Sequence, residues 1–130
     1  MIIYNYLFLL ASAMALFFSI GHAVWGLRFI LVDVQASTMP ALTKHMLLVI
    51  WHQPTVFHFL AAVALFIAAL SGDKLAAYPL AIFIGVVTFG FFLNYGVTSL
   101  VKNRSALPQI IPQTIAIAVY FGIIIAGMRG

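Results

Sequence analysis

The stretch Trp51-His52-Gln53-Pro54-Thr55-Val56-Phe57-His58 places two imidazoles, an amide and a proline inside a long apolar run. An ionisable side chain within a membrane-spanning segment is costly to bury, so it is a functional-site candidate by default. The proline removes the helical donor of the Ile50 carbonyl, and lipid offers that carbonyl no replacement. The stretch therefore predicts a membrane-spanning helix with a polar patch, and the rest of the chain is best understood around it.

Composition assigns the chain to the membrane proteins. Of its 130 residues, 65% are hydrophobic and only 6% are charged, whereas a soluble domain is about 25% charged. There is no cysteine and no glutamate, and the only carboxylates are Asp33 and Asp73. Thiol chemistry and paired-carboxylate catalysis therefore have no candidates. No catalytic residue is predicted, which favours a non-enzymatic protein.

Four apolar runs predict four membrane spans, at about 2–32, 40–70, 76–101 and 107–128, in a single transmembrane domain covering 1–130. The first run resembles a secretory signal at Ala11-Ser12-Ala13, but no lysine or arginine precedes it and the apolar character continues beyond it. We therefore expect an uncleaved span. Short turns between the runs predict antiparallel neighbours, and so an all-α, up-down-up-down four-helix transmembrane bundle.

The basic residues predict the orientation. Arg28, Lys44, Lys102 and Arg104 gather at one end of this topology, while Lys74 and Arg129 lie at the other. The positive-inside rule then places both termini outside the cytoplasm, in what we expect to be a bacterial inner membrane. The net charge of +4 comes from scattered residues rather than a basic cluster. It favours contact with the lipid bilayer and argues against nucleic-acid binding.

Polar side chains from all four spans are predicted to lie at similar depth. Ser12, Ala15, Ser19 and Gly26 share one helical face with His22 and suit close helix packing, but packing does not explain the histidine. In the second span His52, Thr55 and His58 lie within one arc. We expect a polar pocket that opens toward the first and third turns, lined by His22, Trp25, Trp51, His52, Thr55, His58, Asn94, Tyr95, Gln109 and Gln113. Taken singly, Asn94, Gln109 and Gln113 are better explained as hydrogen bonds between helices.

The dipeptide Gly21-His22, with Gly26 one turn on, and the dipeptide Trp51-His52 resemble a pattern in small uncharacterised four-helix bacterial membrane proteins. This resemblance covers the first half of the chain. It implies the same fold and draws attention to His22 and His52 as a pair, but it implies no activity.

Three functions remain open at this stage. The first is a protein that binds a hydrophobic small molecule, or an accessory subunit that assembles with a membrane-protein partner or as a homo-oligomer. The second is a redox protein in which His22 and His52 hold b-type haem or a metal ion, or line a quinone site. The third is a small transporter or channel subunit, which is disfavoured by the lack of an internal repeat.

Overall fold

The structure, a computed structural model, describes residues 5–102 and 104–129. The first helical column consists of α1 (Tyr6–Trp25), a π-helical turn η1 (Gly26–Ile30) and α2 (Leu31–Ala36). Two long helices follow, α3 (Ala41–Ser71) and α4 (Lys74–Lys102), and then a short 3-10 turn η2 (Arg104–Ala106) and α5 (Leu107–Arg129). No strand occurs in the described residues. The predicted all-α four-helix fold is confirmed.

Four of these helical segments are long and apolar enough to cross a membrane: Tyr6–Ala36, Ala41–Ser71, Lys74–Lys102 and Ile111–Arg129. Their mean hydropathies lie between 1.9 and 2.1. The first three are 29 to 31 residues long, which is more than the roughly 20 needed for a bilayer core. The chain is therefore an integral membrane protein. The helix α3 continues through Pro54 without interruption.

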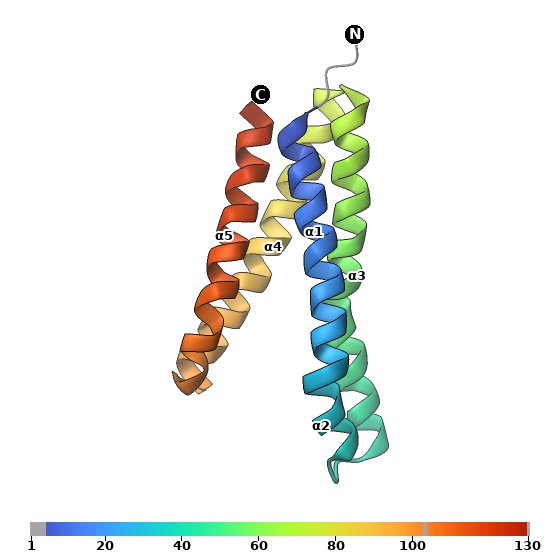
Figure 1. The fold of residues 1–130 in the computed structure, drawn as a ribbon, viewed down its shortest axis with the longest axis vertical. Helices are drawn as coiled ribbons and strands as arrows, with labels where there is room; N and C mark the ends of the chain where they lie inside the picture. The colour runs from blue at the N-terminus through green and yellow to red at the C-terminus, as the bar shows by residue number, and fades with distance from the viewer. Residues whose placement is uncertain (1–4, 103, 130) are drawn as a thin grey trace.

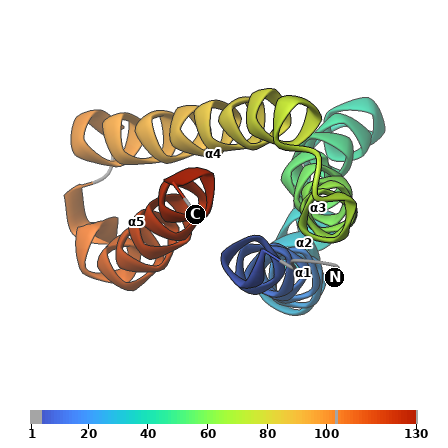
Figure 2. The same ribbon diagram turned by 90° about the horizontal axis from the view of Figure 1, so that it is seen from above.

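The helices form two antiparallel hairpins, α1–α3 and α4–α5, which meet at one end and diverge toward the other (Figure 1). The C-terminal end of α5, the start of α1 and the turn between α3 and α4 lie together at the closed end. Seen from above, α4 runs away from α3, and α5 runs back beneath it toward α1 (Figure 2). The bundle therefore has a closed end and an open end.

Small side chains allow the close approach at the closed end. Alanines supply much of the buried core there, namely Ala11, Ala15, Ala61, Ala62, Ala68, Ala69, Ala77 and Ala81. In lipid, small residues let helix backbones approach closely enough for packing to hold them together. At Gly127, for example, a Cβ would come within 2.6 Å of the buried Phe8 ring.

Asn5 ties three helices together at this end. Its side-chain oxygen accepts a hydrogen bond from the Phe8 amide and so caps α1. Its amide nitrogen Nδ2 donates to the carbonyl of Gly127 on α5 at 2.7 Å, and its backbone N–H donates to the carbonyl of Ala69 on α3 at 3.1 Å. No comparable links are described between the hairpins at the open end, where they separate.

Candidate functional site

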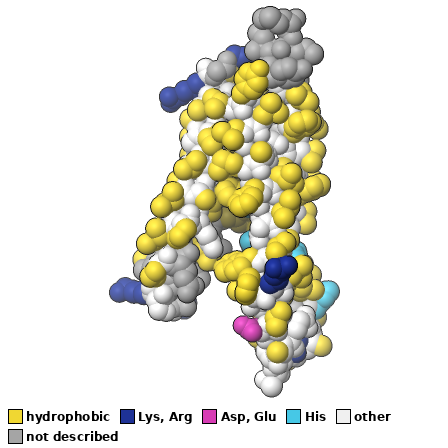
Figure 3. Space-filling view, viewed as in Figure 1, with side chains coloured by type: hydrophobic (Ala, Val, Ile, Leu, Met, Phe, Trp, Pro, Cys, Tyr) yellow, Lys and Arg dark blue, Asp and Glu magenta, His cyan; other side chains and the backbone are white. Residues whose placement is uncertain are grey.

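The space between the separated ends of the two hairpins is the most prominent hollow on the face drawn in Figure 3, and histidine side chains lie at its edge. We call it the inter-hairpin hollow. Its walls are the lower halves of α1 and α3 on one side and of α4 and α5 on the other. Helical spacing indicates which residues face it, namely those that continue the buried inner stripe of each helix.

The inner stripes of the first hairpin become polar where the hairpins part. On α1, Phe8 is 1% exposed and Ala15 is fully buried, and the next residue at the same seven-residue spacing is His22, which is half-buried. On α3, Leu65 is fully buried and His58 follows it at the same spacing, half-buried. Residues seven apart lie nearly on one face of a helix, so both histidines extend the core into the hollow.

The second hairpin shows the same change. On α4, Ala81 and Thr88 are 0% and 1% exposed, and Tyr95, seven residues further, is 43% exposed. On α5, Tyr120 is fully buried and Gln113, seven residues earlier, is half-buried. A face that is buried in the core thus opens onto the hollow. The sequence-predicted residues His22, His58, Tyr95 and Gln113 all lie on these four inner stripes.

His22 and Trp51 form a stacked pair across the first hairpin. Their ring centroids are 4.4 Å apart and the rings are inclined by only 14°. The Trp51 indole Nε1 donates to the carbonyl of His22 at 3.3 Å. The indole lies directly against Gly26, where any Cβ would collide with it. Gly26 is also the first residue of the π-helical turn, a distortion that often occurs at functional sites.

Hydrogen bonds fix the orientation of His22. Its Nδ1 lies 3.0 Å from the hydroxyl Oγ1 of Thr55, and the hydroxyl of Ser19 donates to the Thr55 carbonyl at 2.9 Å. The second ring nitrogen, Nε2, has no partner among the described residues. The ring is therefore held firmly while one nitrogen stays available.

His58 has a defined tautomer. Its Nδ1 lies 2.7 Å from the carbonyl oxygen of Pro54, and because a carbonyl only accepts, Nδ1 must carry the proton. In the neutral ring Nε2 is then a hydrogen-bond acceptor. Phe18 of α1 meets the imidazole edge-on at 5.8 Å, and Phe91 of α4 lies 6.3 Å away, both measured between ring centroids. His58 thus contacts both hairpins where they begin to diverge.

His52 lies in an open depression on α3 with a volume of about 560 Å³. Gln53 and Phe57 line the same depression. Phe57 also meets Phe91 of α4 at 5.4 Å, so this part of α3 faces the second hairpin. Trp51, the residue before His52 on α3, covers one face of the His22 ring.

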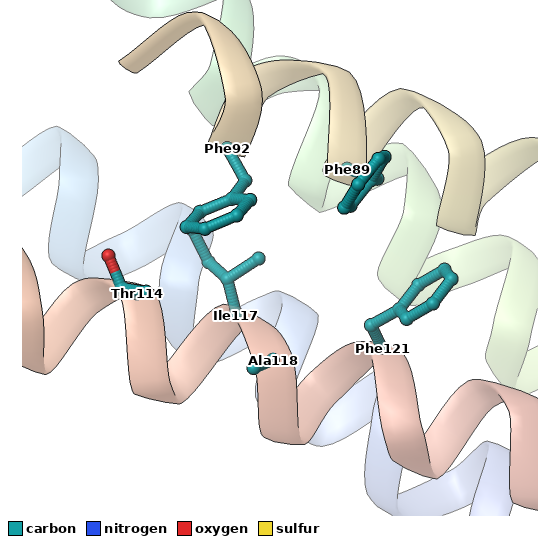
Figure 4. A pocket seen from close by; sticks show the side chains of 6 residues that line it. All are labelled: Phe89, Phe92, Thr114, Ile117, Ala118 and Phe121. Atoms are coloured by element: carbon teal, nitrogen blue, oxygen red, sulfur yellow. The ribbon is translucent and has the colours of Figure 1, made fainter. Parts of the chain in front are cut away.

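A second, smaller cavity lies within the other hairpin (Figure 4). Its volume is about 130 Å³, and it is lined by Phe89 and Phe92 of α4 and by Thr114, Ile117, Ala118 and Phe121 of α5. The rings of Phe89 and Phe121 stack at 6.0 Å. Because this lining is almost entirely apolar, the cavity suits a hydrocarbon group rather than a polar one.

The remaining predicted site residues are placed less centrally. Trp25 is 40% exposed and lies 6.2 Å from Trp51, between ring centroids. Asn94 is exposed on α4, one position away from the inner stripe. The side chain of Gln109 lies outside the described residues. Within residues 5–102 and 104–129, no three His, Asp or Glu side chains gather in a way that would hold a metal ion.

Several contributing residues were not predicted as part of the site. Ser19 and Gly26 were interpreted as packing residues, although both position the His22–Trp51 pair. Thr88 and Tyr120 carry buried hydroxyls without hydrogen-bond partners, seven residues from Tyr95 and Gln113 on the same inner stripes. Gln53 belongs to the polar stretch 51–58, but the pattern of that one helix does not show whether its side chain faces the rest of the bundle. The signal that could have indicated these residues is the seven-residue spacing, which continues the buried face of each helix.

No protein-family model matches the chain, and no curated protein or solved structure matches it either.

Proposed function

We propose that the protein binds a hydrophobic molecule with a polar head group in the inter-hairpin hollow. One observation carries the proposal: all four inner stripes change from buried core to polar side chain where the hairpins diverge. His22, His58, Tyr95 and Gln113 then face a space that something other than the protein must fill. Polar groups inside a membrane need hydrogen-bonding partners, and a ligand head group supplies them.

The side chains around the hollow define what the head group must offer. In its neutral form His58 presents an acceptor nitrogen, and Gln113 presents both donors and an acceptor. The free Nε2 of His22 accepts or donates according to its tautomer. A head group with carbonyl and hydroxyl oxygens satisfies this set. The aromatic rings of Phe18, Phe57 and Phe91 at the deep end suit a hydrocarbon tail or a ring.

This chemistry supports binding rather than catalysis. The described residues around the hollow offer no nucleophile paired with a base and a carboxylate that orients it. A quinone falls within the proposal, because it joins carbonyl oxygens to an apolar ring and tail. A partner helix in the hollow, as in an accessory subunit, would instead leave no small molecule to detect.

The setting we propose is a bacterial inner membrane with the open end of the bundle in the cytoplasm. Arg28, Lys44, Lys102 and Arg104 belong to that end of the chain's topology, and basic residues concentrate on the cytoplasmic side of membrane proteins. A ligand would then enter the hollow from the inner leaflet.

Native mass spectrometry of the protein released from lipid nanodiscs tests the proposal. We expect a discrete non-covalent adduct of lipid-like mass on the wild-type chain. Gln113→Trp fills the hollow from α5 and should remove most of the adduct. The matched control is Ile115→Trp, which adds the same ring to the same helix at a residue that is 58% exposed and points about 160° away from Gln113.

The proposal fails if the wild-type chain carries no adduct, or if Gln113→Trp and Ile115→Trp retain the adduct equally. Circular dichroism on both variants checks that the helices are intact. An adduct of the size of a second protein would instead support the accessory-subunit reading.

A further inference from the structure

We infer that the outer face of α3, an exposed stripe that runs from Leu42 to Leu70, is the interface of a symmetric dimer with a second copy of this chain. The inference goes beyond the proposed function and does not depend on it, because this stripe lies on the side of α3 opposite to the buried core. It rests on Gln53, an amide that faces the membrane interior, and on the apolar side chains above and below it.

The outer face is turned away from the other helices. Figure 2 shows α3 at the edge of the bundle, with α1 and α4 on one side of it. Val63 and Ile67, two residues before and after the buried Leu65, point about 160° away from it, and they are 44% and 59% exposed. Gln53 lies two residues from Trp51, which packs on α1, so it also points about 160° away from that helix.

Exposed residues follow the outer face at alternating spacings of four and three along the whole helix. They are Leu42, Met46, Val49, Gln53, Val56, Leu60, Val63, Ile67 and Leu70. This is the seven-residue repeat with which two helices pack side by side. Valine recurs at every seventh residue, as Val49, Val56 and Val63, and β-branched side chains at one of the two repeating positions are typical of parallel two-stranded pairs.

Gln53 distinguishes this stripe from an ordinary lipid-facing surface, which an apolar pattern alone would suit equally well. It lies about 18 Å from the start of α3 at Ala41 and about 27 Å from its end at Ser71, so it is within the membrane span. Its side chain is exposed, and within residues 5–102 and 104–129 it has no hydrogen-bond partner. Lipid tails offer an amide neither a donor nor an acceptor, so its partner must come from outside this copy.

A second copy of the chain supplies that partner by symmetry. Copies that insert with the same topology point the same way across the membrane, so a two-fold axis along the membrane normal pairs the two α3 helices in parallel. Gln53 then meets the partner subunit's Gln53 at the same depth. Each amide carries donors and an acceptor, so the two form a reciprocal pair. The open depression of about 560 Å³ along Val49, Gln53, Val56 and Leu60 leaves room for the partner's side chains.

Other occupants fit the outer face less well. A lipid tail fills the depression but leaves the amide of Gln53 unpaired. An unrelated membrane helix needs its own polar residue at the depth of Gln53, whereas a second copy has one there already. Charge does not oppose the dimer, because Lys44 is the only lysine or arginine of α3 and points about 160° away from Met46. Its Nζ donates to the carbonyl of Gln35 at 2.7 Å.

Cysteine cross-linking in membranes tests the contact, because the chain has no native cysteine. Val56→Cys should give a disulfide-linked dimer under mild oxidation, since equivalent positions of a parallel pair meet at the axis. The control is Val86→Cys on α4, where the valine is 63% exposed against 55% for Val56. Both valines lie about 20 Å from the turn between α3 and α4. The control should remain monomeric.

Energy transfer between donor-labelled and acceptor-labelled copies in liposomes measures the strength of the pair, with the dyes on Thr38→Cys. Dilution of the protein in lipid gives a dissociation constant, which Gln53→Leu should raise about tenfold, the factor that corresponds to two interhelical hydrogen bonds of average strength. Asn94→Leu removes an exposed amide from α4 and should leave the constant unchanged. Gln53→Asn keeps an amide and should dimerise more tightly than Gln53→Leu.

The inference is overturned if Val56→Cys cross-links no better than Val86→Cys, or if energy transfer shows only monomers. Equal dissociation constants for the wild-type chain and Gln53→Leu, or for Gln53→Asn and Gln53→Leu, would contradict the amide pair. Equal weakening by Gln53→Leu and Asn94→Leu would show that the effect is not specific to the outer face. The dimer has twice the mass of the chain, so native mass spectrometry distinguishes it from a lipid adduct.

Discussion

The imidazole of His22 lies flat against the indole of Trp51, with ring centroids 4.4 Å apart. The stack joins α1 to α3 beside the inter-hairpin hollow. It depends on Gly26, which leaves room for the indole, and on Thr55, which holds the imidazole edge. The polar wall of the hollow is thus built by packing and hydrogen bonding within one hairpin, and this makes its parts separately testable.

Replacing Gly26 with alanine should disrupt the stack, because the new Cβ would collide with the Trp51 indole. Overpacking of this kind destabilises a protein by about 1–3 kcal/mol. Trp25 and Trp51 are the only tryptophans, so intrinsic fluorescence should change together with the free energy of unfolding. Gly21→Ala is the control, since a Cβ at Gly21 meets nothing within 4 Å. Equal effects of the two substitutions would contradict the close approach of Trp51 to Gly26.

Thr55→Val should remove the hydrogen-bonding partner of His22 while keeping the shape of the side chain. Hydrogen bonds between transmembrane helices contribute about 0.6 kcal/mol on average and up to roughly 1.7 kcal/mol, so we expect a loss in this range. A double-mutant cycle with His22→Ala, followed by unfolding in detergent, measures the coupling. Thr43→Val, at an exposed residue at the start of α3, should cost nothing measurable. A coupling energy of zero between positions 22 and 55 would argue against the bond.

The purified protein should be colourless. The ligand that we propose for the hollow is an organic head group held by hydrogen bonds, and it leaves no role for an iron ligand. An absorption spectrum of freshly purified protein checks this, and a metal analysis of the same sample covers bound ions. A Soret band that disappears in both His22→Ala and His52→Ala would establish the redox alternative in place of ligand binding.

The open end of the bundle should face the cytoplasm. Because the chain has no native cysteine, single cysteines can report the side of the membrane. Thr38→Cys, in the turn before α3, should be shielded from an impermeant thiol reagent added outside the cell, and Asp73→Cys, in the turn before α4, should react. The reverse pattern would invert the topology, and equal reactivity of both positions would mean that a span does not cross the membrane.

Much of the fold was predictable because it depends on properties of single residues. Runs of apolar side chains determine the four helices, and the short Ser37–Pro40 turn determines antiparallel pairing. Helical periodicity also placed His22 on the face shared by Ser12, Ser19 and Gly26. These relationships lie within one helix, so sequence spacing is enough to find them.

The separation of the hairpins was not predictable from the same patterns. It depends on how side chains from different helices meet, as where Phe18 contacts both Tyr120 and His58. The π-helical turn at Gly26 and the stacking of Trp51 on His22 likewise arise between helices. Periodicity shows which face of its helix a residue occupies, but not how far away the neighbouring helix lies. A closed pocket and an open hollow are therefore compatible with the same sequence pattern.

The central claim is that a bound hydrophobic molecule occupies a hollow between hairpins that meet at only one end. Pulsed electron–electron spin resonance in nanodiscs tests it directly, with one pair of labels at Tyr6 and Arg129 at the closed end and another at Ala36 and Lys102 at the open end. We predict a clearly longer distance for the open-end pair, which shortens when bound lipid is stripped by detergent, while the closed-end distance stays constant. Equal distances for both pairs, as in a regular bundle with neighbouring axes about 8–10 Å apart throughout, and no response to lipid removal, would contradict the account.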